Sequence, residues 1–273
     1  DCLTAYSIVN GYDLGSVFLA PPINATVNDD YSMAQGAWGS KNITGWSVCT
    51  GAVMAGANSV TARITWDYGS NGTDIQYIKS YPNISYGNIP GDVIPVISNL
   101  PITTNTQNPI IASWDVSKTV SNGSTGDIAF DIWFSSDGKS TSVVLNQSTT
   151  TLEMMIWVDG WGEFEANNIL GWISQGFIKT EWHKIVTIDG TQWLVRYTKA
   201  GDVGGTTVAP VANIVFQAIT PIFKGSLDIM KLVQYTKQQG ISGVNYMDNI
   251  EFGAELATGK GDLQIKSYSI TFK

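Results

Sequence analysis

Short runs of β-branched and aromatic residues recur along the chain, and this pattern constrains the fold more than any other feature. Clusters of Gly, Asn, Asp and Ser separate the runs, for example at 135–138 and 189–190. Such runs predict β-strands, and the clusters between them predict turns. We expect strands at 59–66, 128–134, 150–158, 184–188, 193–197, 211–218, 246–252 and 263–272. Because helices do not alternate with these strands, the pattern predicts an all-β sandwich or barrel.

One segment, 227–239, has the features of a helix. Ser226 precedes it as a candidate N-cap, Asp228 lies in its first turn, Lys237 lies in its last turn and Gly240 follows it. These residue types are favoured at these positions, because they satisfy the terminal backbone groups or complement the helix dipole. We expect this helix to pack on a single domain that covers 1–273. We expect the stretch 87–108, rich in Pro, Asn and Thr, to form a surface excursion.

The composition argues against several classes of partner. Only 14% of the residues are charged, the formal net charge is −8, and Lys and Arg are scattered. Nucleic acid and anionic membranes bind clustered positive charge, so neither is an expected partner. No apolar stretch approaches the ~18 residues that a membrane-spanning helix needs. The abundant uncharged polar residues fit a neutral carbohydrate better.

Sequons and cysteines indicate an extracellular protein. The chain has two cysteines, which permit only one intramolecular bridge. Six Asn-X-Ser/Thr sequons begin at Asn24, Asn42, Asn71, Asn83, Asn122 and Asn146. Glycosylation and disulfide formation are both typical of secreted proteins. We therefore expect a secreted glycoprotein, and we interpret the start at Asp1 as that of a processed chain.

Two of the six glutamates lie in settings that suggest catalysis. Glu153 lies inside the strand predicted at 150–158, where a buried carboxylate is costly unless it is paired or solvated. Because side chains alternate along a strand, Glu153 shares a face with Met155 and Trp157, and the residues between them form an apolar core face. Glu255 follows the strand predicted at 246–252. Two carboxylates on different strands predict the arrangement that hydrolyses glycosidic bonds.

Other roles for these carboxylates have to be weighed. Glu153 is also compatible with an edge position or a buried ion pair, and Glu255 with an exposed turn. If Glu255 lies in an exposed turn, Glu251 is the alternative acid, because an even spacing along a strand places Glu251 and Glu255 on the same face. Asp131 shares a face with Trp133 on the strand predicted at 128–134. We expect Asp131 to lie beside Glu153 on the adjacent strand and to support it.

At these residues the chain resembles glycoside hydrolase family 12, the β-jelly-roll endoglucanases and xyloglucanases. The resemblance rests on short motifs that occur in the family's order. They are Gly36-Ala37-Trp38-Gly39, Lys79-Ser80-Tyr81-Pro82-Asn83, Asp131-Ile132-Trp133-Phe134, Glu153-Met154-Met155-Ile156-Trp157, Asp189-Gly190-Thr191-Gln192-Trp193 and Phe252-Gly253-Ala254-Glu255. The chain departs from the family pattern at Ala254, where threonine is usual, and at Gly36, where asparagine is usual.

The resemblance implies a β-jelly-roll sandwich of two antiparallel sheets, with a concave substrate cleft and one packed α-helix. It implies a retaining endo-acting enzyme that cleaves β-1,4-glucan, whether cellulose, mixed-linkage glucan or xyloglucan, without a cofactor or metal. In the family's roles, Glu153 is the nucleophile, Glu255 is the acid/base and Asp131 is the partner of the nucleophile. It also implies a disulfide between Cys2 and Cys49. We expect a monomer whose partner is its polysaccharide substrate.

Aromatic side chains in such a cleft stack on the faces of sugar rings. The candidate substrate contacts are Trp38, Trp133, Met155, Trp157, Trp66 and Tyr6. Two other functions remain open: a non-catalytic carbohydrate-binding jelly-roll module, and a xylanase of the related family 11. His183, the only histidine, lies near a turn and is expected to be structural. The sparse charges and the placement of Asp131 predict an acidic optimum and resistance to unfolding by acid.

Overall fold

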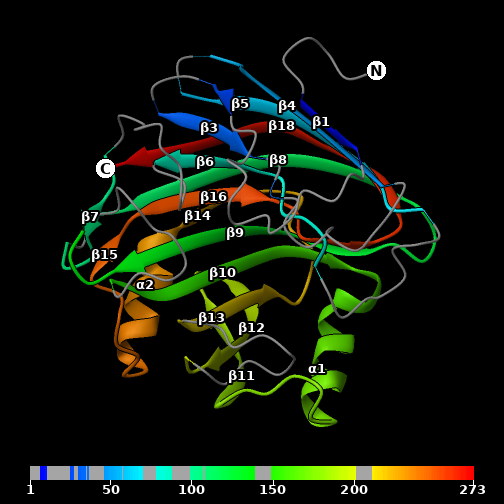
Figure 1. Ribbon diagram of the computed structural model, residues 1–273. Helices are drawn as coiled ribbons and strands as arrows, with labels where there is room; N and C mark the ends of the chain where they lie inside the picture. The colour runs from blue at the N-terminus through cyan, green and yellow to red at the C-terminus, as the bar shows by residue number, and fades with distance from the viewer. Residues whose placement is uncertain are drawn as a thin grey trace.

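The computed structural model describes residues 7–10, 25–27, 30–34, 36, 46–56, 58–69, 78–87, 99–106, 108–138, 149–200 and 211–273. In these residues two β-sheets pack face to face as a sandwich, with two α-helices beside the larger sheet (Figure 1). The predicted all-β sandwich is therefore confirmed.

The smaller sheet has six strands and contains both an early strand and the last strand of the chain. In spatial order its strands are β1 (Ser7–Asn10), β4 (Ser47–Met54), β5 (Val60–Asp67), β18 (Lys260–Phe272), β8 (Ile110–Val120) and β14 (Lys224–Asp228). The long strand β18 pairs with both β5 and β8, so the C-terminal segment lies in the middle of this sheet.

The larger sheet has twelve strands, and it holds the segments that carry the candidate catalytic residues. Its main path runs through β11 (Trp182–Ile188), β12 (Thr191–Thr198), β13 (Ala212–Ala218), β10 (Thr150–Trp161), β9 (Thr125–Ser135), β16 (Asn249–Gly253), β6 (Asn83–Gly87), β3 (Tyr31–Ala34) and β2 (Ala25–Thr26). The short strands β7 (Ile102–Thr103), β15 (Tyr246–Met247) and β17 (Leu256–Thr258) pair beside this path.

One strand pair differs from the expected antiparallel arrangement. Strands β10 and β13 are parallel, with Glu153 opposite Asn213. Parallel neighbours need a long crossover connection. Here the connection contains the 3₁₀ helix η1 (Gly162–Phe164), the helix α1 (Ala166–Ser174) and the hairpin formed by β11 and β12. The sheet thus has one parallel seam next to the candidate nucleophile.

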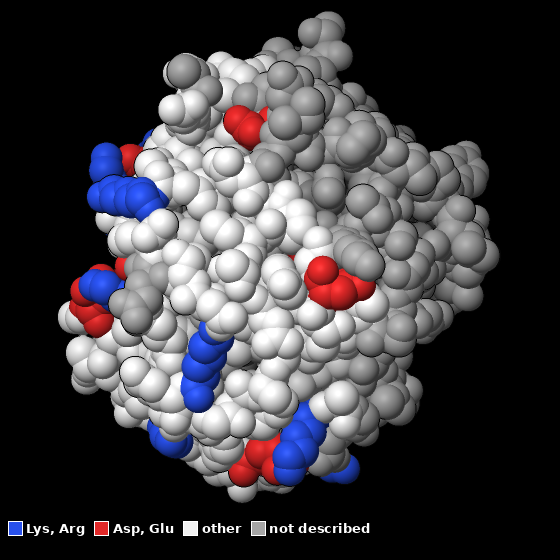
Figure 2. All heavy atoms as spheres, turned by 90° about the vertical axis from the view of Figure 1, so that its left-hand side faces the viewer, with Lys and Arg blue, Asp and Glu red and all other residues white. Residues whose placement is uncertain are grey.

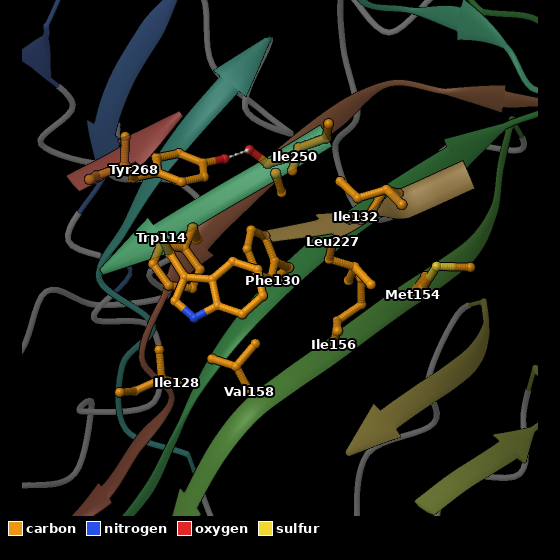
Figure 3. Close-up of a cluster of buried hydrophobic side chains, with 14 of the residues drawn as sticks. Trp114, Ile128, Phe130, Ile132, Met154, Ile156, Val158, Leu227, Ile250 and Tyr268 are labelled. Carbon is orange, nitrogen blue, oxygen red and sulfur yellow. Dashed lines mark hydrogen bonds between the residues drawn. The ribbon is translucent and has the colours of Figure 1, made fainter. Parts of the chain in front are cut away.

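The main hydrophobic core lies between the two sheets, and alternation along each strand supplies it. On β10, Leu152, Met154 and Ile156 are all completely buried in it. Aromatic rings from both sheets meet at its centre, where Trp114 of the smaller sheet packs against Phe130 of the larger sheet (Figure 3). Within the larger sheet, the ring centroids of Phe130 and Phe252 lie 4.4 Å apart. Tyr268 brings a hydroxyl into this apolar region, and it donates a hydrogen bond to the Ile250 carbonyl at 3.2 Å (Figure 3).

A second, smaller cluster lies on the opposite face of the larger sheet, which we call the outer face. It contains Met155 and Trp157 of β10 together with Phe164 and Ile169. Ile169 is the buried residue of α1, so this helix packs against the outer face through the small cluster. One set of alternating side chains on β10 therefore enters the main core, and the other set lies beside the candidate active site.

The predicted helix is present as α2 (Ile229–Gln238), but it begins later than expected. Ser226 is the third residue of strand β14 and does not act as the cap. The N-cap is Asp228, whose side chain accepts a hydrogen bond from the Met230 amide. Lys237 lies in the last turn, as predicted. The pairing of β14 with β8 extends the strand into the residues that the local pattern assigned to the helix.

Helix α1 was not predicted, because only one of its residues is buried and its sequence contains asparagine and glycine, which are weak helix formers. No helix in the described part of the chain is long and apolar enough to cross a membrane. Charged side chains are scattered over the face shown in Figure 2, and most of the described atoms there belong to uncharged residues. This agrees with a charged fraction of only 14%.

Replacement of Phe130 by Ala is expected to destabilise the fold strongly. Phe130 is completely buried and contacts aromatic rings of both sheets, including Trp114 at 5.3 Å between centroids. Removing such a ring leaves a cavity and costs about 3–5 kcal/mol. The free energy of unfolding can be measured in urea. Phe177→Ala is the control, because Phe177 is 64% exposed and its loss should change stability by less than ~0.5 kcal/mol. Similar losses in the two variants would contradict the assigned core.

Candidate active site

The outer face brings together carboxylates from three neighbouring strands. Glu153 lies on β10, Asp131 on β9 and Glu251 on β16. In the strand register Asp131 is directly opposite Met155 on one side and Glu251 on the other. Glu153 is opposite Trp133, so Asp131 is its diagonal neighbour. Asp131 lies near Glu153 as predicted, but its directly paired acid is Glu251.

Glu153 is partly buried and has two hydrogen-bonding partners. The Nδ2 group of Asn213 donates to its Oε2 at 2.7 Å, and the parallel pairing of β10 with β13 places Asn213 directly opposite. Burial raises the pKa of Glu153 to about 7, while the hydrogen bonds with Asn213 and Asp131 act in the other direction. The charge of Glu255 adds to the rise, so the two predicted catalytic carboxylates influence each other electrostatically.

Asp131 and Glu251 form a buried pair of acids, with exposed fractions of 6% and 5%. Burial raises the pKa of Asp131 well above its ordinary range, and the charges of Glu153 and Glu251 raise it further. Burial also raises the pKa of Glu251 to about 8, although a hydrogen bond from Asn249 at 2.7 Å opposes the rise. Two acids this close cannot ionise independently. Burial and the neighbouring charges therefore favour the protonated form of Asp131.

Glu255 lies just after β16, and the last residue of this strand, Gly253, has to be a glycine. A Cβ atom on Gly253 would lie 2.1 Å from the Pro82 carbonyl oxygen, which no side chain tolerates. Asp127 then holds Glu255 through the backbone. The Asp127 amide donates to the Glu255 carbonyl at 3.0 Å, and the Asp127 Oδ1 atom accepts from the Glu255 amide at 3.4 Å. This explains the glycine in the motif that ends at Glu255.

Asp127 is a functional candidate that the sequence did not reveal. It is completely buried, and burial together with the charge of Glu255 raises its pKa well above the ordinary range. Burial also raises the pKa of Glu255, while a hydrogen bond with Asp127 and the charge of Arg196 lower it. Burial and the charge of Glu255 thus favour the protonated form of Asp127. The sequence did contain one signal for Asp127. It lies four residues before Asp131 on the same strand, so the alternation of side chains places both on one face.

Asn213 and Arg196 are also new members of the site. Both lie on the outer face, Asn213 near the start of β13 and Arg196 on β12. Arg196 is 8% exposed, and burial lowers its pKa to about 10 against the opposing charges of Glu255 and Asp127. The charged residue between Val195 and Tyr197 was a visible signal in the sequence, but no local pattern assigned Arg196 to Glu255.

The aromatic candidates lie in different environments. Trp133 is half-buried on the outer face opposite Glu153, where it remains a candidate substrate contact. Met155 and Trp157 also lie on this face but are 7% and 5% exposed. Trp66 lies in the main core, 3% exposed, with its ring 6.0 Å from that of Trp161. The prediction for Trp66 is therefore wrong, because the core covers it. Trp38 and Tyr6 lie outside the described residues.

Several other predicted features have a structural explanation. Cys49 is buried on β4 and is disulfide-bonded; Cys2 lies outside the described residues, so the Cys2–Cys49 pairing stays a prediction. Gly36 has a φ of 51°, and a Cβ there would lie 2.3 Å from the Tyr81 carbonyl oxygen. An asparagine is thus disfavoured at this position. Ala254 is completely buried in the core, so this departure affects packing.

Of the six sequons, two begin in the described part of the chain. Asn83 is 3% exposed, and its side-chain amide donates a hydrogen bond to the Tyr81 carbonyl at 3.1 Å. A glycan at Asn83 is incompatible with this burial. Asn122 lies in an exposed turn between β8 and β9, where a glycan can be accommodated. No cluster of three or more His, Cys, Asp or Glu among the described residues is arranged to hold a metal ion.

Comparison with known proteins identifies the family. Residues 29–273 match the family model described as Glycosyl hydrolase family 12. The match covers most of the chain, and the chain therefore belongs to this family of glycoside hydrolases.

Individual relatives are distant but similar over nearly their full length. The probable xyloglucan-specific endo-β-1,4-glucanase A of Aspergillus niger is 26% identical over 250 residues, which are 89% of this chain and 86% of the relative. Endoglucanase S of Pectobacterium parmentieri is 24% identical over 90% of this chain and 83% of its own. The structure of the native family 12 xyloglucanase from Bacillus licheniformis superposes with a TM-score of 0.71 at 20% identity, covering 98% of this chain and all of that one.

The buried acids predict that this protein is most stable at acidic pH. Glu251 has an ordinary pKa of 4.5 and a folded-state pKa of about 8. The folded state therefore binds more protons than the unfolded state between these values, and stability should fall as the pH rises through this window. Thermal unfolding followed by circular dichroism should give a higher Tm near pH 4.5 than near pH 8.

Glu251→Gln should make this pH dependence weaker, because it removes one of the groups that must ionise inside the protein. Glu165→Gln is the matched control, since Glu165 is exposed and its side chain makes no capping hydrogen bond. A Tm that rises between pH 4.5 and pH 8 would contradict the assigned burial.

Proposed function

We propose that this protein is a secreted, monomeric, retaining endo-acting glycoside hydrolase that cleaves β-1,4-glucan by double displacement. The observation that carries the proposal is the pair Glu153 and Glu255. They come from different segments of the larger sheet, and the charge of Glu255 raises the pKa of Glu153. Membership of glycosyl hydrolase family 12 supports this function over that of a non-catalytic carbohydrate-binding module or a family 11 xylanase.

In the first step, ionised Glu153 attacks the anomeric carbon and forms a covalent glycosyl-enzyme. Protonated Glu255 donates its proton to the glycosidic oxygen as that bond breaks. In the second step, Glu255 accepts a proton from water, and the water oxygen attacks the anomeric carbon and releases Glu153. Both displacements invert the anomeric centre, so the product retains the β-configuration.

Two buried acids supply the proton arrangement that these steps need. Asp131 keeps its proton and stabilises the Glu153 carboxylate through a hydrogen bond. Asp127 shares a proton with Glu255, so this second pair retains one proton after the first ionisation. One carboxylate of the catalytic pair is then charged while the other remains an acid.

The relatives favour β-1,4-glucan, and xyloglucan in particular, as the first substrate to test. The Aspergillus niger relative is named as xyloglucan-specific, and the Bacillus licheniformis structure is that of a xyloglucanase. The half-buried Trp133 beside Glu153 supports a sugar-binding role for the outer face. The secreted location is supported by disulfide-bonded Cys49 and by the exposed sequon at Asn122. A panel of xyloglucan, mixed-linkage glucan, carboxymethyl-cellulose and xylan, with analysis of the products, tests the substrate class.

Alanine substitutions should separate the roles of the two glutamates. Glu153→Ala should reduce turnover by at least about 10⁴-fold, because the nucleophile of the covalent step is absent. Glu255→Ala should spare aryl glycosides with activated leaving groups, which depart without protonation, and added azide should yield a β-glycosyl azide. Steady-state kinetics and product analysis by proton NMR measure both effects.

The stereochemistry of the first product tests the same assignment independently. Retention requires the two carboxyl groups to lie about 5–5.5 Å apart, too close for a water molecule to attack from the far side. A first product of α-configuration would show that Glu153 does not act as the nucleophile. Equal activity of Glu255→Ala on polymeric and activated substrates would exclude Glu255 as the acid.

The raised pKa of Glu153 predicts an acid limb of kcat/KM near pH 7, above the acidic range expected from the charge content. The rate should fall as the pH drops through this value, because protonated Glu153 cannot attack. Asn213→Ala removes a hydrogen bond to the carboxylate and should move the limb to higher pH by about one to two units, since such charged hydrogen bonds contribute about 1.5–3 kcal/mol. Asn168→Ala is the control, because Asn168 bonds to the Gly162 carbonyl instead. An unchanged limb in Asn213→Ala would contradict this role.

A further inference from the structure

Arg196 lies on the outer face without the ion pair that a buried guanidinium usually has. It is 8% exposed, and no carboxylate of the described residues lies within 4.0 Å of it. Glu255 and Asp127 nevertheless influence its pKa, so both lie nearby. The guanidinium of Arg196 therefore lies more than 4.0 Å from the carboxylate of Glu255, the proposed acid/base.

Two side chains fix the guanidinium in this place. Its central carbon lies 4.5 Å from the ring centroid of Trp157, a cation–π contact, and its Nη1 group donates to Gln217 Oε1 at 3.3 Å. Gln217 is itself 1% exposed and donates to the Phe164 carbonyl at 2.7 Å. The ring of Phe164 stacks on Trp157, with centroids 5.5 Å apart. Trp157 thus supports Arg196, and neighbouring side chains cover its ring.

The remaining donors of Arg196 are available to a ligand. Its Nε and Nη2 groups have no hydrogen-bond partner among the described residues, and neither is sealed from solvent. A guanidinium presents its N–H groups in a fixed planar fork, which suits two neighbouring oxygen acceptors. Adjacent hydroxyl groups of a sugar ring present such acceptors. The carboxyl groups of Asp127 and Glu255 could also accept from these donors, but they interact with each other.

We infer that Arg196 is a positioning residue that binds hydroxyl groups of the sugar on the leaving-group side of the cleaved bond. The inference rests on the proposed function. Arg196 stacks on Trp157, which is opposite Ala129 on β9, and Ala129 lies two residues from Asp127. The Asp127 amide donates to the Glu255 carbonyl at 3.0 Å, so these contacts lead from Arg196 toward Glu255, the group that protonates the leaving oxygen. The same site holds the acceptor sugar when a saccharide replaces water in the second step.

Partitioning of the glycosyl-enzyme gives a direct test. An aryl cellotrioside forms the intermediate without acid assistance, and added cellobiose then competes with water for it. Both reactions use Glu255 as base, so an altered pKa of Glu255 cancels in the ratio of transfer to hydrolysis. Arg196→Met should lower this ratio by about 10-fold or more, because only transfer uses the hydrogen bonds of Arg196. Arg196→Lys should lower it less, because lysine keeps the charge but lacks the planar fork.

Lys184→Met is the matched control, because Lys184 also lies over a tryptophan ring, at 4.8 Å from Trp182, but is exposed on the edge strand β11. Its ratio of transfer to hydrolysis should stay unchanged.

An unchanged ratio in both Arg196 variants, with pH profiles that shift equally for transfer and hydrolysis, would reduce Arg196 to an electrostatic role and overturn the inference. So would a failure of the unaltered enzyme to transfer at high cellobiose concentration. No turnover of the aryl donor by the unaltered enzyme would instead overturn the proposed function, and the inference with it.

Discussion

The two-residue alternation of β9, β10 and β16 is the constraint on which the rest of the structure depends. One set of side chains on these strands fills the space between the sheets, where Phe130, Ile156 and Phe252 are completely buried. The other set carries the carboxylates on the outer face. The core therefore fixes the position of the proposed catalytic residues, because a shift of one residue in register would exchange the two sets.

This coupling has an electrostatic consequence. Strands held by a close-packed core place their carboxylates close together in a partly buried region, where the charged form is disfavoured. The pKa of each of the five acids at the site is raised, and burial is the largest cause for each. The site thus retains protons near neutral pH. A retaining mechanism needs one such proton on the acid and one bare carboxylate on the nucleophile.

Arg196 and Asn213 limit the accumulation of protons at the site. Asn213 donates to Glu153, and Arg196 lowers the pKa of Glu255 through its charge. Arg196 comes from β12, inside the long crossover after β10, and Asn213 comes from β13, the strand that follows it. The parallel seam between β10 and β13 therefore has a functional role, because it brings a hydrogen-bond donor directly opposite the proposed nucleophile.

Local pattern in the sequence was sufficient to predict the all-β fold class, the two faces of β10, the position of Lys237 in its helix and the separate segments that carry Glu153 and Glu255. These features depend on periodicity and on residue types close together in the chain. The start of helix α2, the burial of Trp66 and the contacts of Asp127 and Arg196 were decided only by the tertiary structure. Each depends on which strands become neighbours and in which register. Alternation tells which face a side chain occupies, but pairing between distant segments determines what that side chain meets there.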